Sequence, residues 1–265
     1  MGVVFQAGYA PGSGDEPIEN ARILHCGRSL SGGSVVDSST EIGFFASGPL
    51  NALTYERWKP GAVPAQWEYD HGAVASADCF CIAAHTAGTA GATLDLQYFD
   101  GADWVTLVSV SPEDDAPIMA LFEPISASAW RVEVTGYACE IGVIRIGLAL
   151  QVPTAIYSGQ SPLTFGRKVA FRSTRSETGQ FLGRTKQRVA LSGAFGWSHL
   201  PSAWVYANWG EFQRAAEDEP FFLAWRPAEF SEVGYCDADQ VPAPAFMGIS
   251  DLMSVEVSVT GLASI

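Results

Sequence analysis

Two short clusters of acidic residues are the side chains of this sequence best suited to acid–base chemistry. They are Glu113-Asp114-Asp115 and Glu217-Asp218-Glu219. Hydrolysis of a glycosidic bond needs two carboxyl groups that face each other across the sugar, about 5 to 10 Å apart. Adjacent acids in one loop point apart into solvent, so neither cluster makes such a pair by itself. We therefore expect solvated loops at both places.

The histidines and cysteines form no recognisable catalytic or metal-binding pattern. The four histidines are scattered, at His25, His71, His85 and His199, and no residue stands in a nucleophile elbow of the Gly-x-Ser-x-Gly type. Cys79 and Cys81 are spaced as neighbours on one face of a strand, without the second pair or nearby histidine of a zinc site. We expect free core thiols, no catalytic residue, no metal and no enzyme activity.

Aspartates near predicted turns leave a structural Ca²⁺ open as an alternative to a chain without cofactors. The candidate oxygen ligands are Asp70, Asp78, Asp95, Asp100 and Asp103. Calcium needs about six to eight converging oxygens, and the sequence has no EF-hand spacing. We therefore expect no cofactor, with calcium as the weaker alternative.

The chain is acidic, and its charged residues are unevenly distributed. Residues 1–150 carry 6 Lys/Arg against 18 Asp/Glu, and residues 151–265 carry 9 against 11. An acidic surface repels phosphate backbones, so we expect no nucleic-acid partner. A local exception lies between residues 167 and 188, where only Glu177 opposes a run of cations: Arg167, Lys168, Arg172, Arg175, Arg184, Lys186 and Arg188.

The basic run predicts a solvated strand face or salt bridges between subunits, with a polyanion site as the alternative. The acidic cluster at 217–219 lies at the C-terminal end of a predicted helix, where the helix dipole disfavours negative charge. Stability does not explain that placement, whereas contact with a basic surface of a neighbouring copy does. The candidate interface residues are therefore Arg167, Lys168, Arg172, Arg175, Arg184, Arg188, Glu217, Asp218 and Glu219.

The elements that must position these residues are mostly short strands. Residues 92–107 read as a hairpin, because an Asp100-Gly101 turn separates two alternating apolar runs. We expect a mainly β chain: an N-terminal arm over residues 1–20, a jelly-roll β-sandwich over 21–150, and a smaller α+β domain over 151–265.

The second domain should contain one main helix. Pro201 and Ser202 are a plausible start, Val205, Trp209, Phe212 and Ala216 recur at helical spacing, and Pro220 stops the run, which places the helix at about 202–217. Residues 221–225 are predicted to form a buried strand, and residues 252–259 a final alternating strand. No apolar run is long enough for membrane insertion.

Four segments of the first domain resemble the discoidin, or galactose-binding-like, jelly-roll family. The segments are Asn51-Ala52-Leu53 followed by Trp58, Trp67 to Gly72, Asp100-Gly101-Ala102-Asp103-Trp104, and Trp130 to Val134. Their order and spacing carry the resemblance. His71 departs from it, because the family usually has an aliphatic residue there.

The whole chain is similar to tail and baseplate proteins of long-tailed, siphovirus-like bacteriophages. The similarity lies in residues 176–184, the following helix and residues 219–227. It implies a structural virion protein of the tail tip or baseplate, made in the bacterial cytoplasm. It also implies other tail proteins as partners and a homo-oligomer, a trimer or hexamer.

Carbohydrate recognition is the alternative function, with host-surface glycans as the ligand. Aromatic rings give sugars an apolar platform, and Tyr55, Arg57 and Trp58 lie in a predicted loop at one end of the sandwich. Such a site requires an exposed aromatic residue near converging polar groups. A glycan-cleaving enzyme is the third option, and it would require two acids facing each other in a groove.

Overall fold

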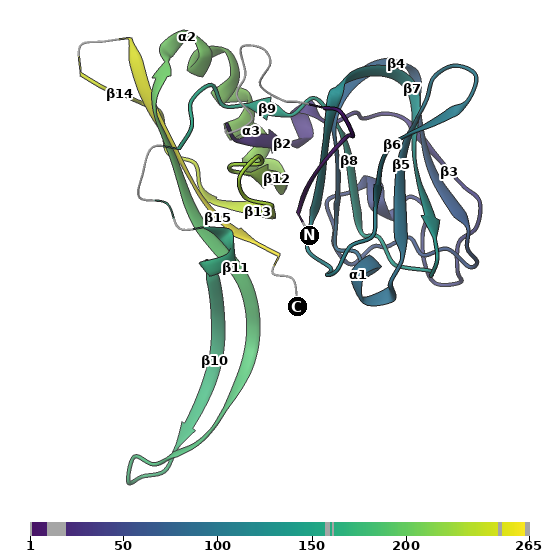
Figure 1. Cartoon of the computed structure of the whole chain (residues 1–265). Helices are drawn as coiled ribbons and strands as arrows, with labels where there is room; N and C mark the ends of the chain where they lie inside the picture. The colour runs from purple at the N-terminus through teal and green to yellow at the C-terminus, as the bar shows by residue number, and fades with distance from the viewer. Residues whose placement is uncertain (1, 10–19, 157–159, 161, 249–250, 263–265) are drawn as a thin grey trace.

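The computed structural model of the chain describes residues 2–9, 20–156, 160, 162–248 and 251–262. These residues form a seven-stranded and an eight-stranded sheet, with one long helical segment over residues 202–218. This arrangement confirms the predicted mainly β class with one main helix. Figure 1 shows the first sheet as a sandwich on one side and a long hairpin extending from the other domain.

The first sheet bends over on itself and so forms both layers of the sandwich. Its strands are β1 (Val3–Phe5), β3 (Ser34–Asp37), β4 (Ala65–Ala83), β5 (Thr93–Phe99), β6 (Trp104–Val110), β7 (Ile118–Thr135) and β8 (Val143–Gly147). The long strands β4 and β7 pair along their whole length, with breaks in register between Asp70 and Ala75 and between Ala77 and Cys79. One layer contains β3, β5 and β6, and the other contains β1 and β8.

The pattern of β4 reflects this change of layer. Near its start, Ala65, Trp67 and Tyr69 are buried and alternate with less buried residues. From Ala77 to Ala83 every residue is buried. A strand covered on both faces reads as a continuous apolar run, so this half of β4 must lie in an inner layer.

The hairpin predicted at residues 92–107 is strands β5 and β6, but its turn is longer than the expected Asp-Gly pair. Asp100 to Asp103 form the loop, and Gly101 has a φ of 105°. The Asp100 carboxylate accepts hydrogen bonds from the backbone N–H groups of Ala102 and Asp103, both at 2.8 Å. These bonds hold the pKa of Asp100 below its usual value and stabilise the wider loop.

The second sheet includes residues from both ends of the sandwich segment. Its strands are β2 (Arg22–Leu24), β9 (Leu150–Gln151), β10 (Arg167–Arg175), β11 (Phe181–Pro201), β12 (Phe221–Ala224), β13 (Val233–Gln240), β14 (Ala245–Phe246) and β15 (Leu252–Gly261). β2 pairs with both β12 and β9. Residues 22–24 and Leu150, which the sequence placed in the sandwich, therefore belong to the second sheet.

The N-terminal arm expected at residues 1–20 is only partly described. Val3–Phe5 is strand β1, which pairs in parallel with β7. The backbone N–H groups of Gly2 and Val3 lie at 3.2 and 3.1 Å from the Ser231 Oγ. This segment therefore connects the sandwich with the second domain, while residues 10–19 lie outside the described residues.

An apolar seam joins the sandwich to the second sheet. Cys79, Cys81 and Met119 from the sandwich pack with Phe222 and Tyr235 of β12 and β13. Alternate residues of β12 face the other way, where they pack against the helix. The molecule is thus a stack of two sandwich layers, the second sheet and the helix.

The helical segment comprises α2 (Ser202–Trp204), a π-helical turn η4 (Val205–Trp209) and α3 (Gly210–Asp218). The four apolar residues that predicted the helix are all buried against the second sheet: Val205, Trp209, Phe212 and Ala216. Short helical turns lie at η1 (Cys26–Arg28), η2 (Gly48–Leu50), α1 (Ala87–Ala90) and η3 (Leu163–Phe165). None of the described helices has the length and apolar character that a membrane crossing requires.

Replacing Phe222 tests the seam. The side chain is fully buried, so Phe222→Ala leaves a cavity and should lower the free energy of unfolding by about 3–5 kcal/mol. Phe181→Ala removes the same atoms from a residue that is 57% exposed and should change it by less than about 0.5 kcal/mol. Urea denaturation of both variants measures the difference, and equal effects would contradict the seam.

Candidate functional site

The loop residues predicted as a contact patch divide into two structural residues and one accessible residue. Trp58 is fully buried, its Nε1 donates to the Ser39 carbonyl at 3.2 Å, and its backbone pairs with Ile141. Arg57 forms an ion pair with Glu140 at 2.7 Å. The expectation that Trp58 lies exposed in the loop is therefore wrong, because its large ring fills the sandwich core.

Tyr55 is the exposed member of the patch, with 73% of its surface accessible. It lines a groove of about 420 Å³ between the sandwich loop and the second sheet. The opposite walls come from β11, β13 and the end of β15, with Arg188, Asp237 and Thr260 among the lining residues. Tyr55 and Arg188, predicted for two separate sites, thus lie around one groove.

One hydrogen bond fixes the loop against the second sheet, and another joins β13 and β15 on the opposite wall of the groove. The Tyr235 hydroxyl donates to the Ala52 carbonyl at 2.9 Å. Burial raises the pKa of Tyr235 to about 12, so this donor stays protonated over the whole physiological range. Thr260 Oγ1 donates to the Asp239 carboxylate at 2.8 Å. We name this feature, lined by Tyr55, Arg188, Asp237 and Thr260, the Tyr55 groove.

The charged side chains of the Tyr55 groove are available to a ligand. Arg188 and Asp237 are exposed, and neither forms a salt bridge within the described part of the chain. A guanidinium donates hydrogen bonds and a carboxylate accepts them, so together they match hydroxyl groups. No local sequence pattern pointed to Asp237 or Thr260, because the groove is lined by segments far apart in the chain.

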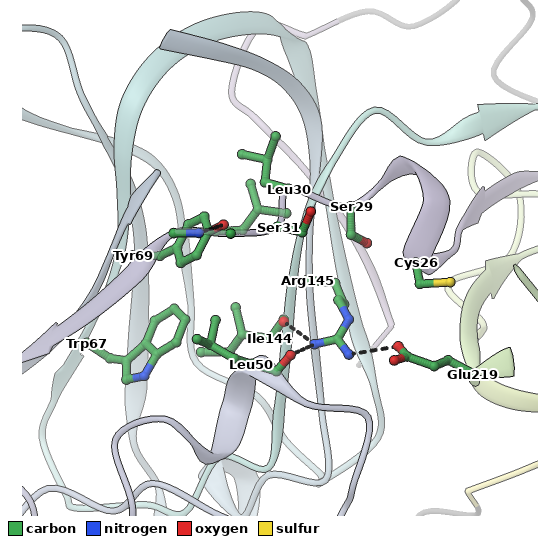
Figure 2. Close-up of a pocket in the computed structure, with 13 residues that line it drawn as sticks. Cys26, Ser29, Leu30, Ser31, Leu50, Trp67, Tyr69, Ile144, Arg145 and Glu219 are labelled. Carbon is green, nitrogen blue, oxygen red and sulfur yellow. Dashed lines mark hydrogen bonds and ion pairs between the residues drawn. The ribbon is translucent and has the colours of Figure 1, made fainter. Parts of the chain in front are cut away.

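A second cavity, of about 200 Å³, lies where the sandwich meets the end of the helix (Figure 2). Apolar side chains, including Leu30, Leu50 and Ile144, line one side of it, and polar groups line the other. Arg145 crosses the cavity, donating to the Leu50 carbonyl at 2.8 Å and approaching Glu219 at 3.4 Å. This arginine holds the loop at η2 and the helix end together.

Glu219 forms an ion pair with Arg145, a contact within the chain that the sequence did not predict. The sequence assigned this residue to an interface between copies, whereas its carboxylate is engaged within the chain. Glu217 and Asp218 are exposed and keep the predicted availability. Cys26 also lines the cavity, and burial, helped by the nearby carboxylates of Glu219 and Asp218, raises the pKa of its thiol. A protonated thiol is a poor nucleophile.

The residues considered for catalysis or metal binding are mostly occupied by structural hydrogen bonds. Asp115 accepts bonds from the N–H and hydroxyl of Thr89 at 2.9 and 2.6 Å. Asp78 accepts the Ala149 N–H at 2.8 Å. In the described residues no three His, Cys, Asp or Glu side chains gather as metal ligands, and the described linings of the groove and cavity contain no two acids facing each other.

The predicted basic run is a projecting two-stranded ribbon. β10 pairs with β11 from Arg167↔Leu191 to Arg175↔Phe181, and a turn at residues 176–180 joins them. Figure 1 shows the ribbon extending well away from both domains. Almost every residue of it is exposed. We call residues 167–191 the arm, which is distinct from the N-terminal arm expected at residues 1–20.

Comparisons with known proteins show a likeness of fold only. No family model and no curated protein matches the sequence. A mutant of chitosan-binding module 1 from a Paenibacillus chitosanase/glucanase is 17% identical and matches 47% of this chain and 98% of its own, with a TM-score of 0.40. The family 32 carbohydrate-binding module of C. perfringens NanJ is 14% identical over 48% and 98%, with a TM-score of 0.40.

A third similar structure, described as SpGH29, is 16% identical and has a TM-score of 0.41. The match covers 48% of this chain and 29% of that protein. The carbohydrate-binding modules are therefore similar to this chain in their fold, over just under half of its length, and the comparison assigns it no ligand.

His25 gives the junction beside the cavity a measurable pH dependence. The ring is buried, and neither of its nitrogens has a hydrogen-bond partner among the residues that the structure describes. Burial, followed by the charge of Arg28, lowers the pKa of His25 from 6.5 to about 4. Below its normal pKa, His25 takes up a proton more readily in the unfolded chain than in the folded one. The contribution of neutral His25 to the free energy of unfolding should therefore be fully present above about pH 6.5 and be lost as the pH falls towards 4, by about 3 kcal/mol.

The variant His25→Phe should remove this contribution. Phenylalanine keeps the ring that packs against Phe212 at 5.7 Å and gives up no hydrogen bond. Urea denaturation at pH 7, 5.5 and 4 is expected to show a flatter decline for the variant than for the wild type. Parallel declines in the two proteins would assign the pH dependence to other groups.

Proposed function

We propose that this chain is a non-catalytic attachment protein, which binds carbohydrate at the Tyr55 groove while its second domain anchors it in a larger assembly. The groove carries this proposal, because it combines an exposed aromatic residue with converging polar groups at a loop of the sandwich. The sequence resemblance suggests that the assembly is the tail tip or baseplate of a long-tailed phage, with a host-surface glycan as the ligand.

The chemistry of the Tyr55 groove suits a sugar. The exposed ring of Tyr55 offers an apolar face to the C–H groups of a pyranose. Arg188 and Asp237 supply a donor and an acceptor for its hydroxyls. The volume of about 420 Å³ lies within the usual range for small-molecule sites, about 300–1,000 Å³.

Glycan cleavage is not part of the proposal. The described lining of the groove contains a single carboxylate, Asp237, and general acid–base hydrolysis needs a second one across the substrate. With one acid, the Tyr55 groove can bind a sugar, but it does not place an acid and a base on opposite sides of the scissile bond.

A purely architectural role is the second candidate, and the exposed arm favours it. A projecting ribbon contributes little to a monomer, whereas in an assembly it supplies contact area. This role and carbohydrate binding are compatible, since only the base of the arm, at Arg188, lines the Tyr55 groove, and the rest of the arm projects away from both domains (Figure 1). Binding measurements with sugars distinguish them.

Tyr55→Ala should weaken carbohydrate binding at least tenfold, because it removes the stacking face without touching the core. A glycan array identifies the preferred sugar for the wild type, and calorimetric titration of that sugar gives the affinities. Tyr137→Ala is the matched control, since Tyr137 is 67% exposed and lies outside the groove lining; it should bind like the wild type.

Asp237→Asn tests the polar side of the same site. The amide keeps the shape of the carboxylate but loses its charge, so affinity should fall while the unfolding midpoint stays constant. If the wild type bound no glycan on the array, carbohydrate binding would be overturned and the architectural role would remain. Equal loss in Tyr55→Ala and Tyr137→Ala would place the sugar elsewhere.

A further inference from the structure

The arm is a ribbon without a third strand. β15 pairs with β11 only from Leu191 onwards. From there to the tip of the arm, β10 and the start of β11 pair only with each other among the described residues. An isolated two-stranded ribbon is marginally stable in water, and its unpaired edges invite pairing or packing with another chain. The arm thus has the properties of a surface that is covered in the assembled protein.

One face of the arm combines aromatic rings with cations. Register places Phe171 opposite Lys186 and Ser173 opposite Arg184. The Arg184 guanidinium lies 3.9 Å from the centre of the Phe171 ring and 5.9 Å from that of Phe181. Phe171 is 49% exposed and Phe181 57%. Arginine and aromatic side chains, phenylalanine included, are enriched in protein interfaces.

Charge identifies the kind of partner. Residues 167–188 have seven cations and one acid, a net charge of +6, so the net charge of −14 for the chain leaves −20 for all other residues. Two arms repel each other, which disfavours a symmetric arm-to-arm dimer. The body of a second copy, by contrast, attracts the arm.

The end of α3 offers an acceptor for the arm. Glu217 and Asp218 are exposed in the last turn, and that turn has no basic residue. Neither side chain forms a salt bridge within the described residues. Negative charge at a helix C-terminus is unfavourable, and cations from another molecule would remove this penalty.

We propose that the arm docks on a second copy of this chain, with its cations against Glu217 and Asp218 at the end of α3. The contact is heterologous: each copy gives its arm to one neighbour and receives an arm from another. The inference deepens only the anchoring part of the proposed function, and it is independent of whether the Tyr55 groove binds sugar.

Complementation between two variants tests the proposal. The first, Arg172→Ala/Arg175→Ala/Arg184→Ala, has a weakened arm and an intact acceptor. The second, Glu217→Lys/Asp218→Lys, has an intact arm and a reversed acceptor. All five side chains are exposed, so both variants should fold, and the second should unfold at or above the midpoint of the wild type because its lysines suit a helix C-terminus. Arg214→Ala, an exposed cation of α3 outside the arm, is the control.

Mass measurement in solution gives the outcome. We expect the wild type and Arg214→Ala to form oligomers whose dissociation constant rises at least tenfold between low and high salt, and each variant alone to be monomeric. An equimolar mixture of the two variants should form a one-to-one heterodimer and stop there, because only one arm and one acceptor are intact in each pair.

Three results would overturn the inference. These are a wild type that is monomeric at low salt, an arm variant that assembles like the wild type, and a mixture that stays monomeric although both variants are folded. The glycan titrations have a separate readout, so sugar binding by a monomeric wild type would remove the docking inference and leave carbohydrate recognition standing.

Discussion

The apolar seam between the sandwich and the second sheet is the contact on which the arrangement of the whole chain depends. Phe222 and Tyr235 lie on one side of it and Cys79 and Cys81 on the other, all of them buried. Because the same β strands are covered on their opposite faces by other layers, the seam cannot loosen without exposing them. It fixes the Tyr55 loop relative to β11 and β13 and so creates the groove.

Local sequence patterns predicted the elements whose burial is regular. The alternation around residues 93–110 and the helical spacing from Val205 to Ala216 translate directly into a hairpin and a helix. The patterns did not predict the length of the arm, because its residues are exposed on both faces. They also missed the placement of residues 22–24 and Leu150, since a short apolar segment fits either sheet.

The candidate site shows where a single sequence stops being informative. Tyr55 was identified by its residue type and its position in a loop. Trp58, three residues away, has an aromatic ring that would suit a sugar equally well, but this ring fills the core. Asp237 and Thr260 reach the groove only through the pairing of β13 with β15 and the packing of the sandwich against them. Such convergence depends on tertiary contacts that no local spacing encodes.

The pairing of β2 with β9 has a consequence for how such a chain can diversify. Arg22 lies opposite Gln151 and Ile23 opposite Leu150, so the 25–149 segment leaves and returns at adjacent points of one sheet. A short turn could bridge those points, so all of the sandwich except β1 is inserted between two neighbouring strands of the second sheet. Exchange of this segment would replace the Tyr55 loop and leave Asp237, Thr260, the arm and the helix as they are.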